Sequence, residues 1–314
     1  MFDHSKAELA AKAAECNFIR DTLEKVMRLA DILAFINDDP ITKGKLALKG
    51  GTAINLIVFD LPRLSVDIDL DFCGEHTRDE MLEQRESITL EIKRYMASQG
   101  YILSPQSKER HSLDSFVYRY RNLGGVNDNI KIEINYSLRS HIFEPTIRKI
   151  AVDKLELAGE VLCLEPMELF AAKINALLSR ATVRDLYDVH KMIKSDLFSD
   201  EQELFRKSIV AYTVISQETV PESYDLARID TITLRKVRSD LLPVIQKGEH
   251  VPLDEMKQKV KGYLIELLRL TDEERTFLMT FKNREFKPEL LFTEQDIIDR
   301  LKRHPMIEWK ISKQ

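Results

Sequence analysis

The sequence predicts an α+β fold in which a mixed sheet with flanking helices comes first and a helical region follows. Residues 46–72 have the pattern of a strand, a glycine turn, a helix and a second strand, and residues 115–137 alternate apolar and polar side chains as a long hairpin does. From residue 196 onward the apolar spacing is mainly that of helices. With 314 residues the chain is long enough for about two domains. We place them at residues 1–195 and 196–314.

The composition bounds the class of protein. Hydrophobic residues make up 44% and charged residues 32% of the chain, which is typical of a soluble globular protein. The net charge of −5 excludes a wholly basic nucleic-acid coat but not a local basic groove. The three cysteines lack metal-finger spacing and fit a reducing cytosol. Because no apolar run is long enough to span a bilayer and the N-terminus has no signal core, we expect a cytoplasmic protein without a membrane partner.

The N-terminal segment is expected to be helical. Residues 3–36 carry an amphipathic stripe that predicts one or two helices. Asp3 or Ser5 is suited to cap the first of them. The segment ends at 38–40, where Pro40 disfavours continuation. We expect these helices to pack beside the sheet.

A row of carboxylates marks the strand predicted at residues 67–72. Because alternate side chains of a strand lie on opposite faces, Asp67, Asp69 and Asp71 share one face and the apolar residues between them share the other. Aspartate is depleted in strands, so three on one face indicate a positively charged ligand. Mg²⁺ prefers oxygen ligands and is usually held by one or two carboxylates and substrate phosphates. We therefore predict a divalent-metal site for Mg²⁺, with Mn²⁺ as the alternative ion.

A glycine turn precedes that strand. A short buried strand at 46–48 is followed by Gly50-Gly51 and by a helix that begins near Thr52. Glycines let the backbone approach a ligand closely, and a helix N-terminus offers N–H groups to phosphate. Together with the carboxylates, this turn indicates a site for a metal–nucleoside triphosphate. An exposed acidic hairpin with a Gly-Gly turn is the alternative interpretation.

A helix and a long hairpin are predicted next. Thr77 and Glu80 fit a capping box for a helix over 77–99, and a strand follows near 101–103. Residues 115–123 and 130–137 form the two strands of the hairpin. On the return strand the isoleucines share one side, and Lys131, Glu133 and Asn135 share the other. Glu133 is therefore either a functional acid or part of a solvated face paired with Lys131.

A lysine-bearing helix is predicted after short strands over 148–164. Pro166 suits the first position of this helix. Lys173, Arg180 and Arg184 lie on one stripe if the helix continues unbroken through Thr182-Val183. A lysine in so apolar a context is costly to bury without a partner, and a triphosphate would be that partner. A surface lysine with a buried stem is the alternative.

The remainder of the chain is expected to be a set of helices. The predicted helices lie at 200–216, 229–246, 253–268, 272–282 and 294–303. Basic residues cluster at 235–238 and at 257–261. Each cluster is either a groove for RNA phosphates or an ordinary solvated helix face.

The order of these motifs resembles that of the AbiEii/MenT-type nucleotidyltransferase toxins, within the polymerase-beta-like nucleotidyltransferase superfamily. The resemblance covers roughly residues 46–190. Its later motifs are Lys173-x-x-Ala176-x-x-x-Arg180 and Arg184-Asp185-x-x-Asp188. It implies a polymerase-beta-like core made of N-terminal helices, a catalytic sheet over 46–165 and a helix over 166–180, followed by the helical domain.

The resemblance also implies roles for individual residues. Asp67, Asp69 and Glu133 would hold the metal, with Glu133 beside the attacking hydroxyl. Asp185 and Lys173 would complete the catalytic set, and whether Asp71 or Asp188 joins it stays open. The residues implied in nucleotide binding are Gly50, Gly51, Thr52, Arg63, Ser65, Lys173 and Arg180.

The implied function is that of a Mg²⁺-dependent nucleotidyltransferase acting as the toxin of a toxin–antitoxin or abortive-infection system. It would transfer a nucleotide from an NTP to an RNA such as the tRNA 3′ end, with release of pyrophosphate, and a cognate antitoxin would restrain it. Two alternatives remain open. The acceptor is a small molecule or a protein hydroxyl, or the fold binds nucleotide and acts through partner contact without turnover.

Overall fold

The structure is a computed structural model of the chain, and it describes residues 2, 4–74, 77–152, 155–221 and 223–312. The predicted α+β class is confirmed: a mixed sheet with flanking helices is present, and further helices follow it. The chain forms two compact units. The first, which we call the sheet unit, comprises Met1–Arg139, Pro145–Leu164 and Pro243–Glu249. The second, the helical unit, comprises Ser140–Glu144, Glu165–Leu242 and His250–Gln314. The division predicted at residue 195 stays a prediction.

The sheet unit is built on one mixed sheet with the strand order β3-β5-β6-β2-β1-β8-β7, and β4 pairs with β5 beside this path. The central strand β2 lies between β1, to which it is antiparallel, and β6, to which it is parallel. The strands are β1 (Leu46–Lys49), β2 (Asp67–Phe72), β3 (Ile102–Leu103), β4 (Lys108–Glu109), β5 (Leu113–Arg121), β6 (Asn127–Asn135), β7 (Thr146–Val152) and β8 (Leu157–Cys163).

The N-terminal helices of this unit are α1 (Lys6–Glu15) and α2 (Arg20–Asp38). Ser5 caps α1 in a capping box with Glu8, whereas Asp3 lies outside the described residues. The predicted capping box of Thr77 and Glu80 opens α4 (Arg78–Ser98). A short helix α3 (Gly50–Ala53) continues as one turn of π-helix, η1 (Ile54–Val58).

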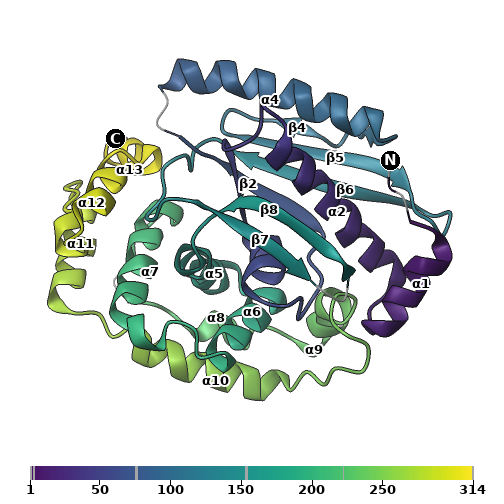
Figure 1. Cartoon of the computed structure of the whole chain (residues 1–314). Helices are drawn as coiled ribbons and strands as arrows, with labels where there is room; N and C mark the ends of the chain where they lie inside the picture. Colours follow the sequence, from purple (N-terminus) through teal and green to yellow (C-terminus); the bar gives the residue numbers. More distant parts are fainter. Residues whose placement is uncertain (1, 3, 75–76, 153–154, 222, 313–314) are drawn as a thin grey trace. The chain divides into compact units, whose positions relative to one another are not determined.

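Helices α2 and α4 cover one face of the sheet (Figure 1). Arg28 of α2 lies over the ring of Tyr120, and Arg85 of α4 forms an ion pair with the buried Asp114. The alternate residues of β5 and β6 on this face are buried, among them Phe116 and Ile132. The residues between them point to the opposite face and are half-buried or exposed. This second face carries the predicted carboxylates.

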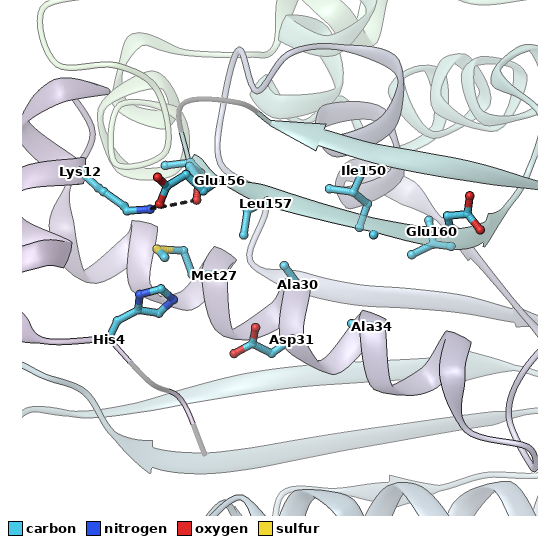
Figure 2. A pocket seen from close by; sticks show the side chains of 13 residues that line it. His4, Lys12, Met27, Ala30, Asp31, Ala34, Ile150, Glu156, Leu157 and Glu160 are labelled. Atoms are coloured by element: carbon cyan, nitrogen blue, oxygen red, sulfur yellow. Dashed lines mark hydrogen bonds and ion pairs between the residues drawn. The ribbon is translucent and has the colours of Figure 1, made fainter.

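A small cavity of about 200 Å³ lies beneath α2 (Figure 2). Its apolar part includes Met27 of α2 and Val161 of β8, and Lys12 of α1 forms an ion pair with Glu156 at its edge. None of the predicted site residues lines it. The cavity therefore belongs to the packing between the N-terminal helices and β7–β8.

The helical unit consists mainly of α-helices. Its helices of eight residues or more are α5 (Pro166–Arg180), α6 (Val183–Lys194), α7 (Gln202–Ser216), α10 (Leu253–Leu267), α11 (Asp272–Lys282), α12 (Gln295–Lys302) and α13 (Pro305–Ser312). Shorter pieces are η3 (Ser199–Glu201), α8 (Ala227–Asp230), α9 (Leu234–Lys236), η4 (Val237–Leu241) and η5 (Pro288–Leu290). In the described part of the chain, no helix combines the length and the apolar character needed to cross a membrane.

The helix predicted over 229–246 is wrong as a single element. It breaks after α8, because residues 231–233 include the β-branched run Thr-Ile-Thr, which has low helix propensity. Thr233 then caps α9 by accepting a hydrogen bond from the N–H of Lys236. Helix α13 was not predicted, although Pro305 stands at its first position.

His190 of α6 gives the helical unit a measurable pH dependence. Burial and the neighbouring Lys194, Lys259 and Lys191 lower the pKa of His190 from 6.5 to about 4. Between these two pH values the unfolded chain binds more protons than the folded one, so the free energy of unfolding should rise with pH across this window. Denaturant titrations at pH 4.5 and 7 should show that the free energy of unfolding rises less with pH in His190→Gln than in the wild type. Equal rises in both proteins would contradict the assignment.

Candidate active site

The carboxylates predicted from the sequence lie on neighbouring strands at the centre of the sheet. In the parallel pairing of β2 with β6, Asp69 stands opposite Glu133 and Asp67 opposite Lys131. Paired residues of adjacent strands point to the same face, and neighbouring strands lie about 4.8 Å apart. The side chains of Asp67, Asp69 and Glu133 are only partly buried. The structure thus brings these three acids together on one partly open face.

Asp71 differs from the other two aspartates of β2. It is fully buried, and Lys49 of β1 forms an ion pair with it at 2.5 Å. The prediction that all three carboxylates share an external positive ligand therefore does not extend to Asp71, because the protein supplies its counter-charge. Lys49 was missed from the sequence, since only the antiparallel pairing of β1 with β2 places it there.

The Gly50-Gly51 turn packs directly against the carboxylate row. Gly50 has a φ of +71°, and a Cβ added to it would lie 2.6 Å from Oδ2 of Asp69. A Cβ added to Gly51 would lie 2.8 Å from Nη2 of Arg63 and 2.9 Å from Oγ of Ser65. The left-handed conformation of Gly50 therefore favours glycine at that position, and the turn brings Asp69, Arg63 and Ser65 close to the first turn of α3.

This close approach gives a prediction with a matched control. Gly50→Ala adds a methyl group that meets Asp69, whereas Gly44→Ala, at a φ of +73°, meets nothing within 4 Å. Both variants should lose about 1–2 kcal/mol of stability from the left-handed conformation. Only Gly50→Ala should also lose the nucleotide transfer that the resemblance implies, because the aspartate must shift. Equal activity in the two purified, folded variants would contradict a functional role for this contact.

Thr52 and Asn55 hold the turn in place, and Arg63 is buried beside it. The Thr52 hydroxyl is buried and donates a hydrogen bond to the carbonyl of Asp67 at 2.5 Å. Arg63 is 2% exposed and donates to the carbonyl of Leu64. Asn55 is buried and its amide donates to the carbonyl of Gly51 at 2.7 Å. Thr52 and Arg63, predicted to bind nucleotide, are thus engaged within the fold, and Asn55 is a positioning residue for which the sequence has no local signal.

Glu133 makes an ion pair with Lys131 on the same strand, at 2.8 Å. Both side chains are partly exposed, so this pair is worth little in stability. The contact predicted as the alternative for Glu133 is therefore present. This ion pair does not separate Glu133 from Asp69, because the register of β2 with β6 keeps the two residues opposite one another.

A second group of charges lies inside the helical unit. Lys173 of α5 is 7% exposed, and its ammonium group lies 2.9 Å from Asp185 and 3.1 Å from Asp188, both on α6 and both 1% exposed. The predicted continuous stripe from Lys173 to Arg184 is interrupted, because Ala181 adopts a left-handed conformation that ends α5. The lysine thus finds its compensating charge within the protein.

Asp185 is the most strongly bound carboxylate of this group. Thr182 caps α6, and its hydroxyl contacts Asp185 at 2.7 Å. Arg180 adds two hydrogen bonds, from Nε at 2.8 Å and from Nη2 at 3.1 Å. Burial alone would raise the pKa of Asp185, but Lys173, Arg180 and Thr182 outweigh it and hold the pKa well below its usual value. The carboxylate is therefore ionised at neutral pH. The Arg180 side chain itself remains 61% exposed.

The side chains on this face of the sheet are of the chemical type that binds a hard divalent cation. Within the residues that the structure describes, no group of three or more His, Cys, Asp and Glu side chains is already arranged to hold a metal ion. Asp67, Asp69 and Glu133 nevertheless offer carboxylate oxygens on one face, which is the ligand chemistry that Mg²⁺ and Mn²⁺ take.

A comparison with known protein families identifies the family to which the chain belongs. The family model described as nucleotidyl transferase AbiEii toxin, type IV toxin–antitoxin system, matches residues 32–283. The chain belongs to the AbiEii nucleotidyltransferase toxin family. The resemblance inferred from the motifs and the assignment to the nucleotidyltransferases are confirmed. Membership of a type IV toxin–antitoxin family also implies an antitoxin partner.

Solved structures add evidence on the fold. MenT4, a nucleotidyltransferase toxin from Mycobacterium tuberculosis H37Rv, matches with a TM-score of 0.65 at 14% identity, covering 96% of this chain and 99% of MenT4. At that identity the likeness shows a shared fold. A chain of the E. coli MS115-1 CdnC:HORMA-deltaN complex matches at 14% identity over 95% of this chain and 96% of its own, but its TM-score of 0.26 carries no argument. No curated protein sequence matches the chain.

Proposed function

We propose that this AbiEii-family toxin transfers a nucleoside monophosphate from an NTP to the 3′ end of an RNA acceptor such as tRNA, with release of pyrophosphate, in a Mg²⁺-dependent reaction. The observation that carries the proposal is the register of β2 with β6. It sets Asp69 directly opposite Glu133, and Asp67 lies two residues before Asp69 on the same face. Acids on adjacent strands face one another here across a single sheet spacing, next to the Gly50-Gly51 turn, in which Gly50 has a positive φ.

Each residue of this group has a proposed role. Asp67 and Asp69 would hold the metal, which when bound supplies positive charge to the triphosphate. Glu133 accepts the proton of the attacking RNA hydroxyl, as a positioned general base does. The α3 amides at Gly50 and Gly51, with Ser65 beside them, bind phosphate oxygens. Following the family motif, we propose that Lys173 and Arg180 take part in nucleotide binding and that Asp185, which forms an ion pair with each, positions them.

The experiment that tests this proposal also separates it from its alternatives. Purified protein is incubated with Mg²⁺ and each of the four α-³²P-labelled NTPs, together with total tRNA, a protein extract or a metabolite extract as acceptor. We expect label in tRNA and stoichiometric pyrophosphate. Label in protein or metabolites but not in RNA would show that the acceptor assignment is wrong. Tight NTP binding without pyrophosphate release under any condition would favour a non-catalytic module and contradict the proposal.

A further inference from the structure

The face of the sheet that bears the carboxylates continues beyond them as a strip of positive charge. In the antiparallel pairing of β5 with β6, Ser115 stands opposite Glu133, Val117 opposite Lys131, and Arg119 opposite Asn129. Because residues two apart along a strand point to the same side, all of them lie on the carboxylate face. Arg121, opposite Asn127, is the last residue of this row.

The charge changes sign along the strands. Asp69 and Glu133 share one row, and the next row pairs Asp67 with Lys131, which forms an ion pair with Glu133. The two rows after that carry Arg119 and Arg121 opposite asparagines, with no acid from β5 or β6 in either row. With a rise of about 3.4 Å per residue, the Arg119 row lies about 14 Å, and the Arg121 row about 20 Å, from the Glu133 row. We call Lys131, Arg119 and Arg121 the basic strip.

The two arginines of the basic strip are accessible. Arg119 and Arg121 are exposed, as are Asn127 and Asn129 opposite them. In the described part of the chain the Arg119 side chain forms no ion pair or hydrogen bond, and Arg121 donates from Nε to the carbonyl of Gly125 only. The other face of β5 is buried beneath α2 and α4 and cannot offer a binding surface.

We propose that the basic strip binds the phosphodiester backbone of a single-stranded RNA end and leads it to Glu133. A guanidinium group is suited to phosphate because its fork of N–H donors matches the phosphate oxygens. Spaced cations along a groove or strand are the usual electrostatic footprint for a polyanion, and exposed amides beside them offer hydrogen bonds to bases. This inference rests on the proposed function, since it assigns the path of the acceptor to that site.

The test uses a fluorescent 12-nucleotide single-stranded RNA, with its affinity measured by anisotropy at several KCl concentrations. The double variant Arg119→Ala/Arg121→Ala removes the exposed part of the basic strip. Its matched control, Arg94→Ala/Arg110→Ala, removes two exposed arginines of the same unit that lie outside the strip. Circular dichroism and thermal melting of all three proteins establish that each is folded.

We expect the strip variant to bind the RNA at least about tenfold more weakly than the wild type. The slope of log K against log salt should also become smaller by about 1.4, because each phosphate contact on a single strand contributes about 0.7 to that slope and two contacts are lost. The control variant should have the RNA affinity and the salt slope of the wild type. In the transfer assay, only the strip variant should show a raised KM for RNA. RNA affinity equal to that of the control, or a selective loss of NTP affinity in its place, would overturn the proposal.

The outcome separates this inference from the proposed function. If RNA binding depends on the two arginines but no nucleotide is transferred, the role of the basic strip is supported and the proposed reaction is contradicted. If nucleotide is transferred to RNA and the strip variant binds RNA as tightly as the control variant, the proposed reaction is supported and the role of the basic strip is contradicted.

Discussion

Asp69→Asn should reduce nucleotide transfer by about 10³-fold or more, the order of loss found when a charged group acting on the transition state is removed. The substitution keeps the shape of the side chain, and Asp69 already makes close contact with Gly50, so the turn should be preserved. What is lost is the negative charge that balances a divalent cation. Transfer rates at saturating NTP and RNA, measured by incorporation of label, provide the test.

The matched control for this variant is Asp79→Asn. Asp79 is exposed in the first turn of α4, which covers the opposite face of the sheet, so its loss should leave transfer unchanged. Glu133→Gln paired with Glu86→Gln extends the comparison to the second strand. Full activity in folded Asp69→Asn would contradict the assignment of this aspartate, whatever the behaviour of Glu133.

Lys173→Met should destabilise the helical unit by about 3–5 kcal/mol, because it leaves two buried carboxylates without their shared counter-charge. Lys173, Asp185 and Asp188 are all almost completely buried, so solvent cannot take over the role of the ammonium group. Urea-induced unfolding at pH 7, followed by circular dichroism, measures the loss. Neutralising both acids as well, with Asp185→Asn and Asp188→Asn, should recover part of it.

The control for this second prediction is Lys236→Met. Lys236 also forms an ion pair, with Asp240 at 3.2 Å, but both side chains are substantially exposed. Such a pair contributes about 0.3–0.5 kcal/mol, so its loss should be small. A similar small effect for Lys173→Met would mean that the buried network is not what holds α5 to α6.

The parts of the fold that were predictable from the sequence are those whose signals are local. The Thr77–Glu80 capping box opens α4, and Pro166 begins α5. The alternation along β6 places Glu133 on the half-exposed side and the isoleucines in the core. In each case the determining residues lie within a few positions of one another, so helix-cap and strand geometry alone decide the outcome.

The parts that were not predictable depend on pairings between distant segments. That Asp71 is neutralised by Lys49 follows from the pairing of β1 with β2, and that Lys173 is held by Asp188 follows from the packing of α5 on α6. The break at Ala181 has no glycine to mark it, because an alanine adopts the left-handed conformation there. A single sequence carries no local record of such contacts, whereas the family motif had already placed Lys173, Asp185 and Asp188 in one group.

The most direct measurement is a crystal structure of the protein soaked with Mn²⁺ and a non-hydrolysable NTP analogue, with the metal located by its anomalous signal. The proposed site predicts a metal peak within coordination distance, about 2.1–2.4 Å, of carboxylate oxygens from Asp67 and Asp69, with the triphosphate against the Gly50-Gly51 turn. A metal and nucleotide bound elsewhere, with Asp67 and Asp69 contacting neither, would contradict the account.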